Sequence, residues 1–221
     1  MLNKMARWAY DQCSLIVAPP VCAYCKRLLA ERQILCGTCV SAITPIVSTT
    51  LEITKKYPMT VFAITQYKDP IKSLILAKRS RAIIASYQLG ELMWQCTPLR
   101  YTPIDYIIPV PLHWTRFVYR GYNQAEESAR IIATHAHRPV VQLLKRVKWT
   151  SYQSSVNVTE REPNIDGAFA LATHDKALYR DKHLLLVDDL MTTGVTLHKA
   201  ARELVALRPA SITAVVAARV V

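Results

Sequence analysis

The second half of the chain alternates between apolar segments with strand character and segments with helical periodicity. Four apolar runs predict strands, at residues 104–110, 165–171, 184–187 and 212–220. Between them, residues 123–137 and 195–208 place apolar side chains at helical spacing, and Asn123 with Glu126 predicts a capping box for the first of these helices. Apolar strands that alternate with helices are typical of a parallel sheet covered on both faces. The predicted fold class is therefore α/β, with a mainly parallel sheet flanked by helices.

The first half of the chain is less regular. Residues 1–20 predict a short helix with an apolar face, residues 21–45 concentrate the cysteines, and the Thr-rich residues 46–60 predict a linker or irregular segment. A strand at 61–67 and a helix at 70–96 are expected to follow. We predict two units: an N-terminal helix and cysteine module with its linker, residues 1–60, and an α/β domain, residues 61–221.

The composition excludes two common classes of nucleotide-binding protein. A hydrophobic fraction of 51% with 20% charged residues is ordinary for a globular protein of 221 residues and too apolar for a disordered one. The five glycines lie too far apart for two of them to share one phosphate loop. Both the GxGxxG turn and the GxxxxGK[ST] loop need closely spaced glycines, so the chain is neither a Rossmann dehydrogenase nor a P-loop ATPase.

The formal charge of +12 is concentrated toward the N-terminus, because residues 1–90 hold twelve Lys and Arg against four Asp and Glu. Such a field attracts polyanions, among them nucleic acid, acidic lipid and phosphorylated metabolites, although a generally basic surface explains it equally well. No apolar run reaches the roughly 18 residues of a membrane span. The apolar residues 13–18 after Lys4 and Arg7 are too few for a signal peptide, so we expect a cytoplasmic protein with reduced thiols.

Four cysteines form the pattern CxxC, ten intervening residues, CxxC, at Cys22, Cys25, Cys36 and Cys39. Two residues between thiolates let one turn present both sulfurs to one ion, and two such turns complete a tetrahedron, with Gly37 expected to supply a positive φ. The pattern predicts a structural zinc site, and an iron–sulfur cluster or redox dithiols are the alternatives. The basic residues of this module are candidates for direct nucleic-acid contact, namely Lys26, Arg27 and Arg32.

The most informative stretch is residues 184–196, in which an apolar strand delivers Asp188 and Asp189 and a hydroxyl- and Gly-containing turn then opens a helix. Two adjacent carboxylates can accept hydrogen bonds from vicinal ribose hydroxyls and attract Mg²⁺. Unpaired amides and hydroxyls at the helix N-terminus can hold a phosphate, here on Thr192, Thr193, Gly194, Val195 and Thr196. The alternative is a solvated strand-end turn with an Asp N-cap.

These residues carry a resemblance. Residues 184–196 resemble the phosphoribosyl-pyrophosphate (PRPP) signature of type I phosphoribosyltransferases, and the chain from about Cys22 onward resembles the competence protein ComF family. The further matching motifs are the four-cysteine module, Tyr67-Lys68-Asp69-Pro70, Pro109-Val110-Pro111, Arg116, residues 120–124, Lys145-Arg146, Gln153, Arg161, Asn164 and Gly167-Ala168-Phe169. Tyr122 stands where the family commonly has Phe, and Val156 where it has Leu.

The resemblance implies a role for each part of the site. Asp188 and Asp189 would bind the ribose hydroxyls as catalytic residues, and residues 192–196 the 5′-phosphate. Arg116 and Arg120 would bind PRPP from the loop after strand 104–110, where surface arginine is the alternative reading. Lys145, Arg146 and Arg161 would belong to a mobile loop at 145–163, for which a solvated charge run is an equal alternative. The implied cofactors are zinc, and magnesium with PRPP.

Three functions remain open from the sequence. The resemblance implies a DNA-uptake factor of natural transformation that handles incoming single-stranded DNA, with a competence helicase or another DNA-processing protein as a partner. The basic N-terminal half and several aromatics on which bases could stack support it: Tyr24, Tyr57, Tyr67 and Trp114. The alternatives are a nucleotide-salvage phosphoribosyltransferase acting on a free base and a non-enzymatic PRPP or nucleotide sensor. Whether the pocket catalyses displacement at the anomeric carbon of PRPP or only binds stays open.

Overall fold

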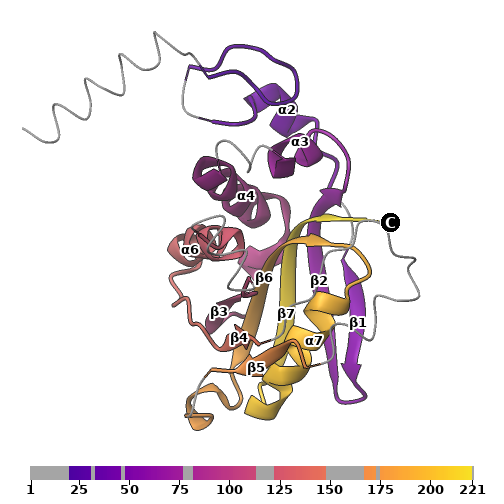
Figure 1. The fold of residues 1–221 in the computed structure, drawn as a ribbon, viewed down its shortest axis with the longest axis vertical. Helices are drawn as coiled ribbons and strands as arrows, with labels where there is room; N and C mark the ends of the chain where they lie inside the picture. Colours follow the sequence, from indigo (N-terminus) through magenta and orange to yellow (C-terminus); the bar gives the residue numbers. More distant parts are fainter. Residues whose placement is uncertain are drawn as a thin grey trace, which may run out of the picture.

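A computed structural model describes residues 20–30, 33–45, 48–76, 82–112, 122–147, 167–172 and 175–220. Its centre is a five-stranded sheet in the order β1-β2-β7-β6-β3 (Figure 1). The strands are β1 (Thr49–Thr54), β2 (Tyr57–Gln66), β3 (Tyr106–Pro109), β6 (His183–Met191) and β7 (Ser211–Arg219). The pairs β2–β7, β7–β6 and β6–β3 are parallel, and only the edge pair β1–β2 is antiparallel. The predicted fold class, a mainly parallel sheet flanked by helices, is confirmed.

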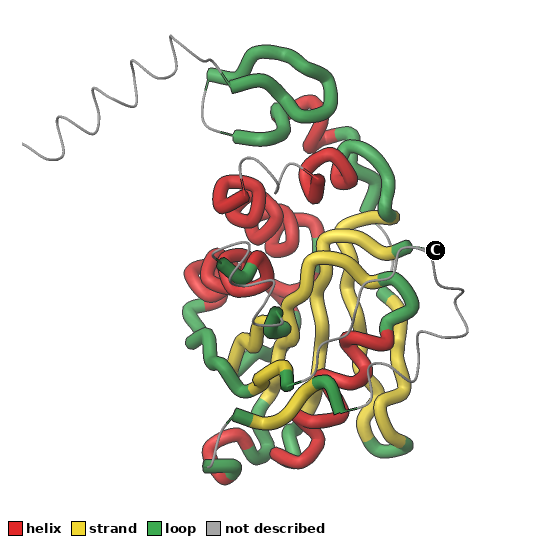
Figure 2. The backbone as a smooth tube through the Cα atoms, viewed as in Figure 1, coloured by secondary structure: helices red, strands yellow, loops and turns green. Residues whose placement is uncertain are grey.

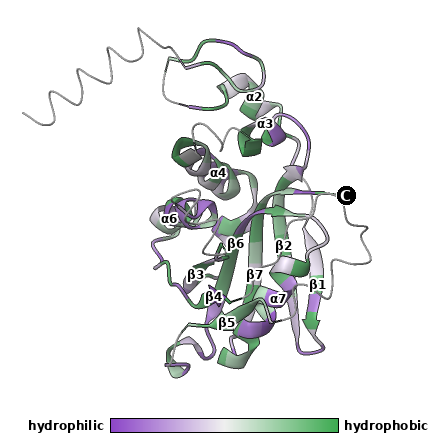
Figure 3. Ribbon diagram, in the orientation of Figure 1, coloured by the Kyte–Doolittle hydropathy of each residue, from purple (hydrophilic) through white to green (hydrophobic). Residues whose placement is uncertain are grey.

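Helices cover both faces of this sheet. On one face lie α3 (Ile71–Leu76), α4 (Ala82–Cys96) and α6 (Gln124–Ala136), and on the other lies α7 (Val195–Leu204) (Figures 1 and 2). Alternate residues of one strand enter opposite layers: Leu185 and Val187 join the cluster under α4 and α6, whereas Leu184 and Leu186 join the cluster under α7. The central strands are therefore apolar on both faces, as their hydropathy colouring shows (Figure 3).

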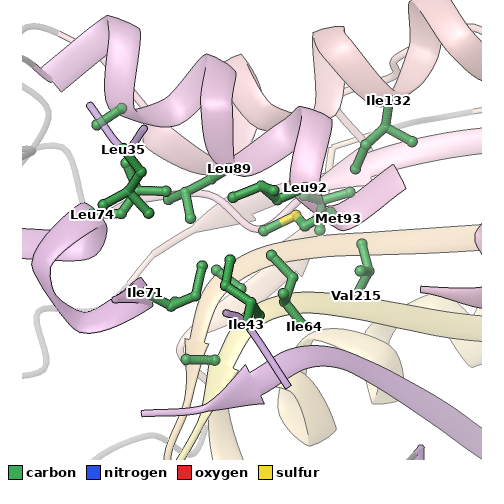
Figure 4. Close-up of a cluster of buried hydrophobic side chains, with 14 of the residues drawn as sticks. Leu35, Ile43, Ile64, Ile71, Leu74, Leu89, Leu92, Met93, Ile132 and Val215 are labelled. Carbon is green, nitrogen blue, oxygen red and sulfur yellow. The ribbon is translucent and has the colours of Figure 1, made fainter. Parts of the chain in front are cut away.

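The cysteine module packs into the first of these two layers. Leu35 and Ile43 belong to the same buried cluster as Leu74 of α3 and Leu89 of α4 (Figure 4). Gln88 of α4 fixes the contact, because its Oε1 accepts hydrogen bonds from the backbone N–H groups of Ile34 (2.9 Å) and Leu35 (3.0 Å). Its Nε2 donates to the carbonyl of Leu35 at 3.1 Å. The N-terminal module is thus bonded to the helical layer of the sheet.

The linker predicted at 46–60 is wrong for the residues that form β1 and the start of β2. In β1 the side chains alternate between more and less exposed positions, ending with buried Ile53, and Met59 of β2 is fully buried. Threonine is β-branched and favours strands, so its density signalled a strand rather than a linker. Lys55 and Lys56 form the two-residue turn between the strands, with the N–H of Tyr57 donating to Thr54 Oγ1 at 3.2 Å.

Other boundaries shift by a few residues. The helix predicted at 70–96 is described as α3 and α4, with residues 77–81 outside the described part, and the strand predicted at 165–171 is described as β5 (Phe169–Leu171). The loop predicted at 145–163 begins instead as β4 (Leu144–Arg146), which pairs with β5 in a two-stranded antiparallel sheet. Short 3-10 helices are η2 (Pro98–Tyr101), η5 (Ala177–Tyr179) and η6 (Val205–Leu207). The helix predicted at 1–20 lies outside the described residues.

None of the helices in the described ranges combines the length and the apolar character that crossing a membrane requires.

Candidate active site and metal centre

The two adjacent aspartates lie at the carboxyl end of β6. This strand extends to Met191, four residues beyond its predicted end. Asp188 and Asp189 therefore lie within the last residues of the strand and not in the loop after it. Both are half-buried, and the N–H of Asp189 donates to Asp188 Oδ1 at 2.8 Å. In open α/β sheets, the carboxyl ends of parallel strands are where ligands bind.

A tight turn joins β6 to α7 and leaves its hydroxyls exposed. Thr192 and Thr193 are exposed, while Gly194 is buried at the N-cap position of α7 with φ +80°. A Cβ on Gly194 would approach Met191 Cε at 3.0 Å and Leu51 Cδ1 at 3.1 Å, so both the backbone conformation and the space favour glycine. The Asp N-cap considered as the alternative is excluded, because Gly194 occupies that position. Val195 and Thr196 form the first turn of α7, whose first N–H groups point out of the helix end.

The connection that carries the predicted PRPP-binding arginines is held at both ends by Asn123. Arg116 and Arg120 themselves lie outside the described residues. Asn123 is buried at the N-cap of α6; its Oδ1 accepts from the N–H of Ala125 at 3.2 Å and its Nδ2 donates to the carbonyl of Val110 at 3.1 Å. Asn123 therefore bonds the start of α6 to Val110, the residue after β3. The predicted role of Asn123 as a helix cap did not include this second bond.

The predicted capping box at this helix is half correct. Asn123 is the N-cap, but the carboxylate of Glu126 binds the guanidinium of Arg130 one turn later, at 2.7 Å. The pKa of Arg130 is raised, first because Glu126 accepts its hydrogen bond and second because of the charge of that carboxylate. Glu126 thus pairs with Arg130 one turn further along α6, in place of the contact with the N-cap that a capping box predicts.

Two of the three residues predicted for the mobile loop lie on a strand. Lys145 is exposed on β4, and the Arg146 guanidinium lies over the Phe169 ring of β5, 5.4 Å from its centroid. The pairing of β4 with β5 places Arg146 opposite Phe169, and these two residues flank the undescribed residues 148–166. Those residues, including Arg161, lie outside the described part, and their closing role stays a prediction.

The four cysteines predicted as metal ligands converge, and all their Sγ atoms lie within 4.8 Å of one another. Cys22 and Cys39 are 3.8 Å apart at sulfur, and Cys25 and Cys36 are 3.7 Å apart. A tetrahedral ion with metal–sulfur bonds of about 2.3 Å requires sulfur–sulfur edges of about 3.8 Å, so this donor set fits one zinc-sized ion. A disulfide is excluded, because its sulfurs lie about 2.05 Å apart.

The two CxxC turns contain the same backbone hydrogen bond, from the fifth residue of the turn to the carbonyl of its first cysteine. The N–H of Lys26 donates to the Cys22 carbonyl and that of Val40 to the Cys36 carbonyl, each at 3.0 Å. The expectation of a positive φ at Gly37 is wrong: Gly37 begins the short helix α2 (Gly37–Ser41), and Lys26 has the left-handed φ of 62°. Lys26 Nζ then donates to the carbonyl of Ala23 at 2.8 Å, which keeps its side chain folded over the first turn.

The thiols of this cluster do not titrate alike. Burial opposes ionisation of Cys22, yet backbone hydrogen bonds from Cys36, Cys25 and Tyr24 outweigh it and lower the pKa of its thiol to about 6. The backbone N–H of Cys39 lowers the pKa of Cys36. Burial, followed by the neighbouring sulfurs, raises the pKa of Cys39 to about 12. Four crowded thiolates repel one another without a cation, so the cluster has the chemistry of a metal centre.

Two of the three basic residues predicted to contact nucleic acid are exposed on this module. Lys26 and Arg27 are exposed, and Arg27 Nη1 donates to Thr38 Oγ1 at 3.3 Å, across the two turns. Arg32 lies outside the described residues.

Comparison with known proteins first defines the class. The family model for the phosphoribosyl transferase domain matches residues 120–220, which include α6, Asp188, Asp189 and the turn before α7. Among solved structures, the chain is similar to the glutamine PRPP amidotransferase of B. subtilis complexed with ADP and GMP, with 14% identity over 62% of this chain and 27% of that one and a TM-score of 0.42. The family model alone shows the class: residues 120–220 match a phosphoribosyl transferase domain.

Curated relatives with competence and DNA utilization names are also similar to the chain. Competence protein F of Haemophilus influenzae is 37% identical over 43% of this chain and 42% of its own length, and competence protein ComFC of Bacillus subtilis is 33% identical over 43% and 36%. The chain thus matches less than half the length of these two relatives. DNA utilization protein YhgH of Salmonella typhimurium is 27% identical over 82% of both chains. These relatives support the resemblance of the chain to the competence protein ComF family.

Proposed function

We propose that this protein is a cytoplasmic DNA-uptake factor that handles incoming single-stranded DNA and uses a PRPP-type pocket to do so. The observation that carries the proposal is the turn at the carboxyl end of β6, where two half-buried carboxylates precede two exposed hydroxyls and an obligate glycine. The competence and DNA utilization names of the relatives support the cellular role. The net charge of +12 supports a polyanionic partner.

In this proposal each part of the pocket meets a different group of a ribose phosphate. Asp188 and Asp189 accept hydrogen bonds from the vicinal ribose hydroxyls, and their oxygens suit Mg²⁺, which when bound would neutralise a pyrophosphate. Thr192, Thr193 and the amides that begin α7 receive the 5′-phosphate. Arg116 and Arg120 approach the pyrophosphate from the segment that Asn123 closes, and the segment between β4 and β5 excludes water.

The cysteine cluster has a structural role in this proposal. Cys22, Cys25, Cys36 and Cys39 would hold one zinc ion and fill its coordination sphere, which leaves no position for a reacting water. The ion would keep Leu35 and Ile43 in the core cluster that supports α4. Lys26 and Arg27, which are exposed on this module, would then be available to an anion, and Arg32 stays a candidate for the same contact.

The test is transformation frequency in a naturally transformable host that lacks this gene and carries it back as wild type or as Asp188→Asn/Asp189→Asn. We expect wild type to restore transformation and the double variant to fail at matched soluble levels, because neutral amides lose the charge that binds Mg²⁺ and weaken the hydroxyl contacts. The matched control is Glu52→Gln/Asp175→Asn, which removes two exposed carboxylates outside the site and should restore transformation like wild type.

Other outcomes assign other functions. Normal transformation in the deletion strain, together with a requirement for a purine or pyrimidine supplement, would replace the proposal with nucleotide salvage on a free base. Equal rescue by wild type and the Asn variant would assign the function to the basic cysteine module, without the pocket. With the purified protein, pyrophosphate release from PRPP distinguishes turnover from binding alone, and co-purification with a competence helicase tests the protein partner.

A further inference from the structure

A concave site lies at the opposite end of the sheet from the two aspartates. Its volume is about 490 Å³, and its lining includes the cations Lys56, Arg180 and Arg208, the ring of Tyr57 and the carboxylate of Asp181. Three positive groups against one negative group make it a cationic pocket, which we call the amino-end pocket. All three cations are exposed, and Tyr57 is half-buried.

The topology of the sheet brings these residues together from distant parts of the chain. Lys56 precedes β2, Arg180 precedes β6 and Arg208 precedes β7, and these three strands are parallel neighbours in the sheet. Their preceding turns therefore meet at the amino ends of the strands, at the lower end of the molecule in Figure 1. The Asp188 site lies at the other end of the same strands, so one ligand of ordinary size cannot occupy both.

Backbone hydrogen bonds join the turns that line the amino-end pocket. The N–H of Asp181 donates to the carbonyl of Arg208 at 3.0 Å, and the N–H of Ala210 donates to the carbonyl of Lys182 at 2.9 Å. Asp181 and Arg208 both have left-handed backbone, with φ of 55° and 52°. Arg208 takes this conformation as the C-cap of η6, and the hydrogen bonds between the two turns hold both residues in place.

The cations of this pocket are available to a ligand. Within the described part of the chain, Lys56, Arg180 and Arg208 form no ion pair with a carboxylate. Lys56 Nζ lies 5.6 Å from the centroid of the Tyr57 ring, which places charge beside an aromatic face. Lys55 and Lys182, each next in sequence to a lining residue, are exposed and extend the positive surface beyond the pocket.

Phosphodiester groups fit this chemistry best. Pockets for small organic ligands are mostly apolar and enclosed, whereas this one is open and lined by exposed cations. Sequence-independent sites for single strands combine a positive groove that follows the backbone with an aromatic ring for base stacking. Three cations from three turns can contact successive phosphates, and Tyr57 offers the ring.

We propose that the amino-end pocket binds the phosphodiester backbone of single-stranded DNA through Lys56, Arg180 and Arg208. The proposal deepens the proposed function and rests on it, because it names the surface by which the chain holds the strand. The surface is separate from the PRPP-type pocket, so strand and ribose phosphate bind at the same time.

The test measures the affinity of the full chain for fluorescently labelled oligothymidylate of about 16 nucleotides, the upper end of typical site sizes, by anisotropy over a range of salt. The variant is Lys56→Gln/Arg180→Gln/Arg208→Gln. Each lost phosphate contact lowers the salt slope of binding by about 0.7, so the triple variant should lower it by about 2 and weaken binding on the order of a hundredfold at 0.1 M salt.

Two matched variants separate the pocket from overall charge. Lys72→Gln/Arg100→Gln/Arg138→Gln removes three exposed cations outside the pocket and should stay within about threefold of wild type, because only long-range attraction changes. Lys56→Arg/Arg180→Lys/Arg208→Lys keeps the charges and should retain most of the affinity. Unchanged melting temperatures establish that all variants fold.

The outcomes distinguish this proposal from the proposed function. If wild type binds the oligonucleotide and the pocket variant matches the control variant, the amino-end pocket is not the strand site, while the proposed function stands. If wild type does not bind oligothymidylate at all, both are overturned. If the pocket variant keeps oligonucleotide binding but loses binding to phosphatidylglycerol vesicles or to inorganic phosphate, the pocket serves a membrane surface or a small anion instead.

Discussion

The two ends of the central sheet differ in charge and in how the chain builds them. The carboxyl end of β6 carries Asp188 and Asp189, and thirteen consecutive residues, 184–196, supply the strand, the carboxylates and the turn. The amino end carries Lys56, Arg180 and Arg208, which are brought together only because β2, β6 and β7 are neighbours. Opposite charges at opposite ends would let the proposed magnesium-dependent ligand and the proposed polyanion bind the same domain without competition.

The cysteine module belongs to only one of these ends. Figure 1 shows it beyond the end at which β7 terminates, and Gln88 and the shared core cluster attach it to α4 there. No described residue of the module lines the amino-end pocket. Disturbing the module should therefore affect the two ends unequally.

Removing the metal should have the largest effect on stability and should affect the two ends of the sheet unequally. The Cys39→Ser variant, or chelation of wild type, should lose the bound ion and unfold the module, because four-cysteine sites of this kind draw roughly 10 kcal/mol or more of folding free energy from zinc. Leu35 and Ile43 then leave the core cluster, so the melting temperature of the whole chain should fall. Calorimetry with and without chelator, together with zinc analysis, measures this.

The matched control for metal removal is Cys96→Ser. Cys96 is a free, half-buried thiol outside the cluster, so this variant should keep its zinc and respond to chelator as wild type does. Under a chelator concentration that removes zinc but leaves the sheet folded, binding of oligothymidylate at the amino-end pocket should persist. Loss of zinc without any change in melting temperature would contradict the structural role of the ion.

Gly194→Ala should damage the carboxyl end alone. The substitution places a side chain at φ +80° and a Cβ at 3.0 to 3.1 Å from Met191 and Leu51, at a cost of about 3 kcal/mol. PRPP affinity, measured by calorimetric titration with Mg²⁺, should fall by at least about tenfold, because a displaced turn misaligns the phosphate donors. Oligothymidylate affinity should not change.

Gly37→Ala is the control for that substitution. Nothing lies within 4 Å of the Cβ that it adds, and Gly37 already lies in a helix. Its stability should equal that of wild type or exceed it slightly. Equal loss of stability in both variants would show that any added methyl group is harmful, and that the N-cap of α7 has no special need for glycine.

The same contrast explains what the sequence could predict. Residues 184–196 reveal their chemistry locally, since strand, carboxylates and helix start follow one another, and the CxxC spacing likewise defines its own geometry. The amino-end pocket needs the strand order, which no local pattern contains, so Arg180 and Arg208 carried no signal. Asn123 was recognised as a cap from local pattern, but its bond to Val110 joins residues thirteen apart and depends on where β3 ends.

The hairpin of β1 and β2 was missed for a different reason. Residues 46–60 were interpreted through their polar composition, although Thr50, Glu52 and Thr54 alternate with more buried neighbours as an edge strand requires. The polar composition of these residues favours a linker more strongly than their two-residue alternation favours a strand. The turn residues Lys55 and Lys56 include no glycine or asparagine that would signal a hairpin. The polar composition around Lys56 therefore predicts a linker and gives no sign of the pocket that Lys56 lines.

Gln88→Ala should loosen the module from the sheet with a smaller effect than loss of the metal. It leaves the N–H groups of Ile34 and Leu35 and the carbonyl of Leu35 without their partner, in a largely buried contact, at a cost of about 2 kcal/mol. Chemical denaturation measures the change. Gln95→Ala, an exposed glutamine of the same helix, should cost less than about 0.5 kcal/mol. Zinc content should equal that of wild type in both variants.

Asn123→Asp should give the smallest effect and isolate one bond. A carboxylate can still accept from the N–H of Ala125 and favours a helix N-terminus, but it cannot donate to the carbonyl of Val110. The loss of stability should be about 1 kcal/mol, whereas Asn123→Ala, which removes both bonds, should lose about 1 kcal/mol more. If the segment between β3 and α6 binds pyrophosphate, Asn123→Asp should reduce the free energy of PRPP binding by more than it reduces the free energy of unfolding. The affinity for oligothymidylate should stay unchanged. Equal weakening of both ligands would mean that the two ends of the sheet are coupled through α6 and are not independent sites.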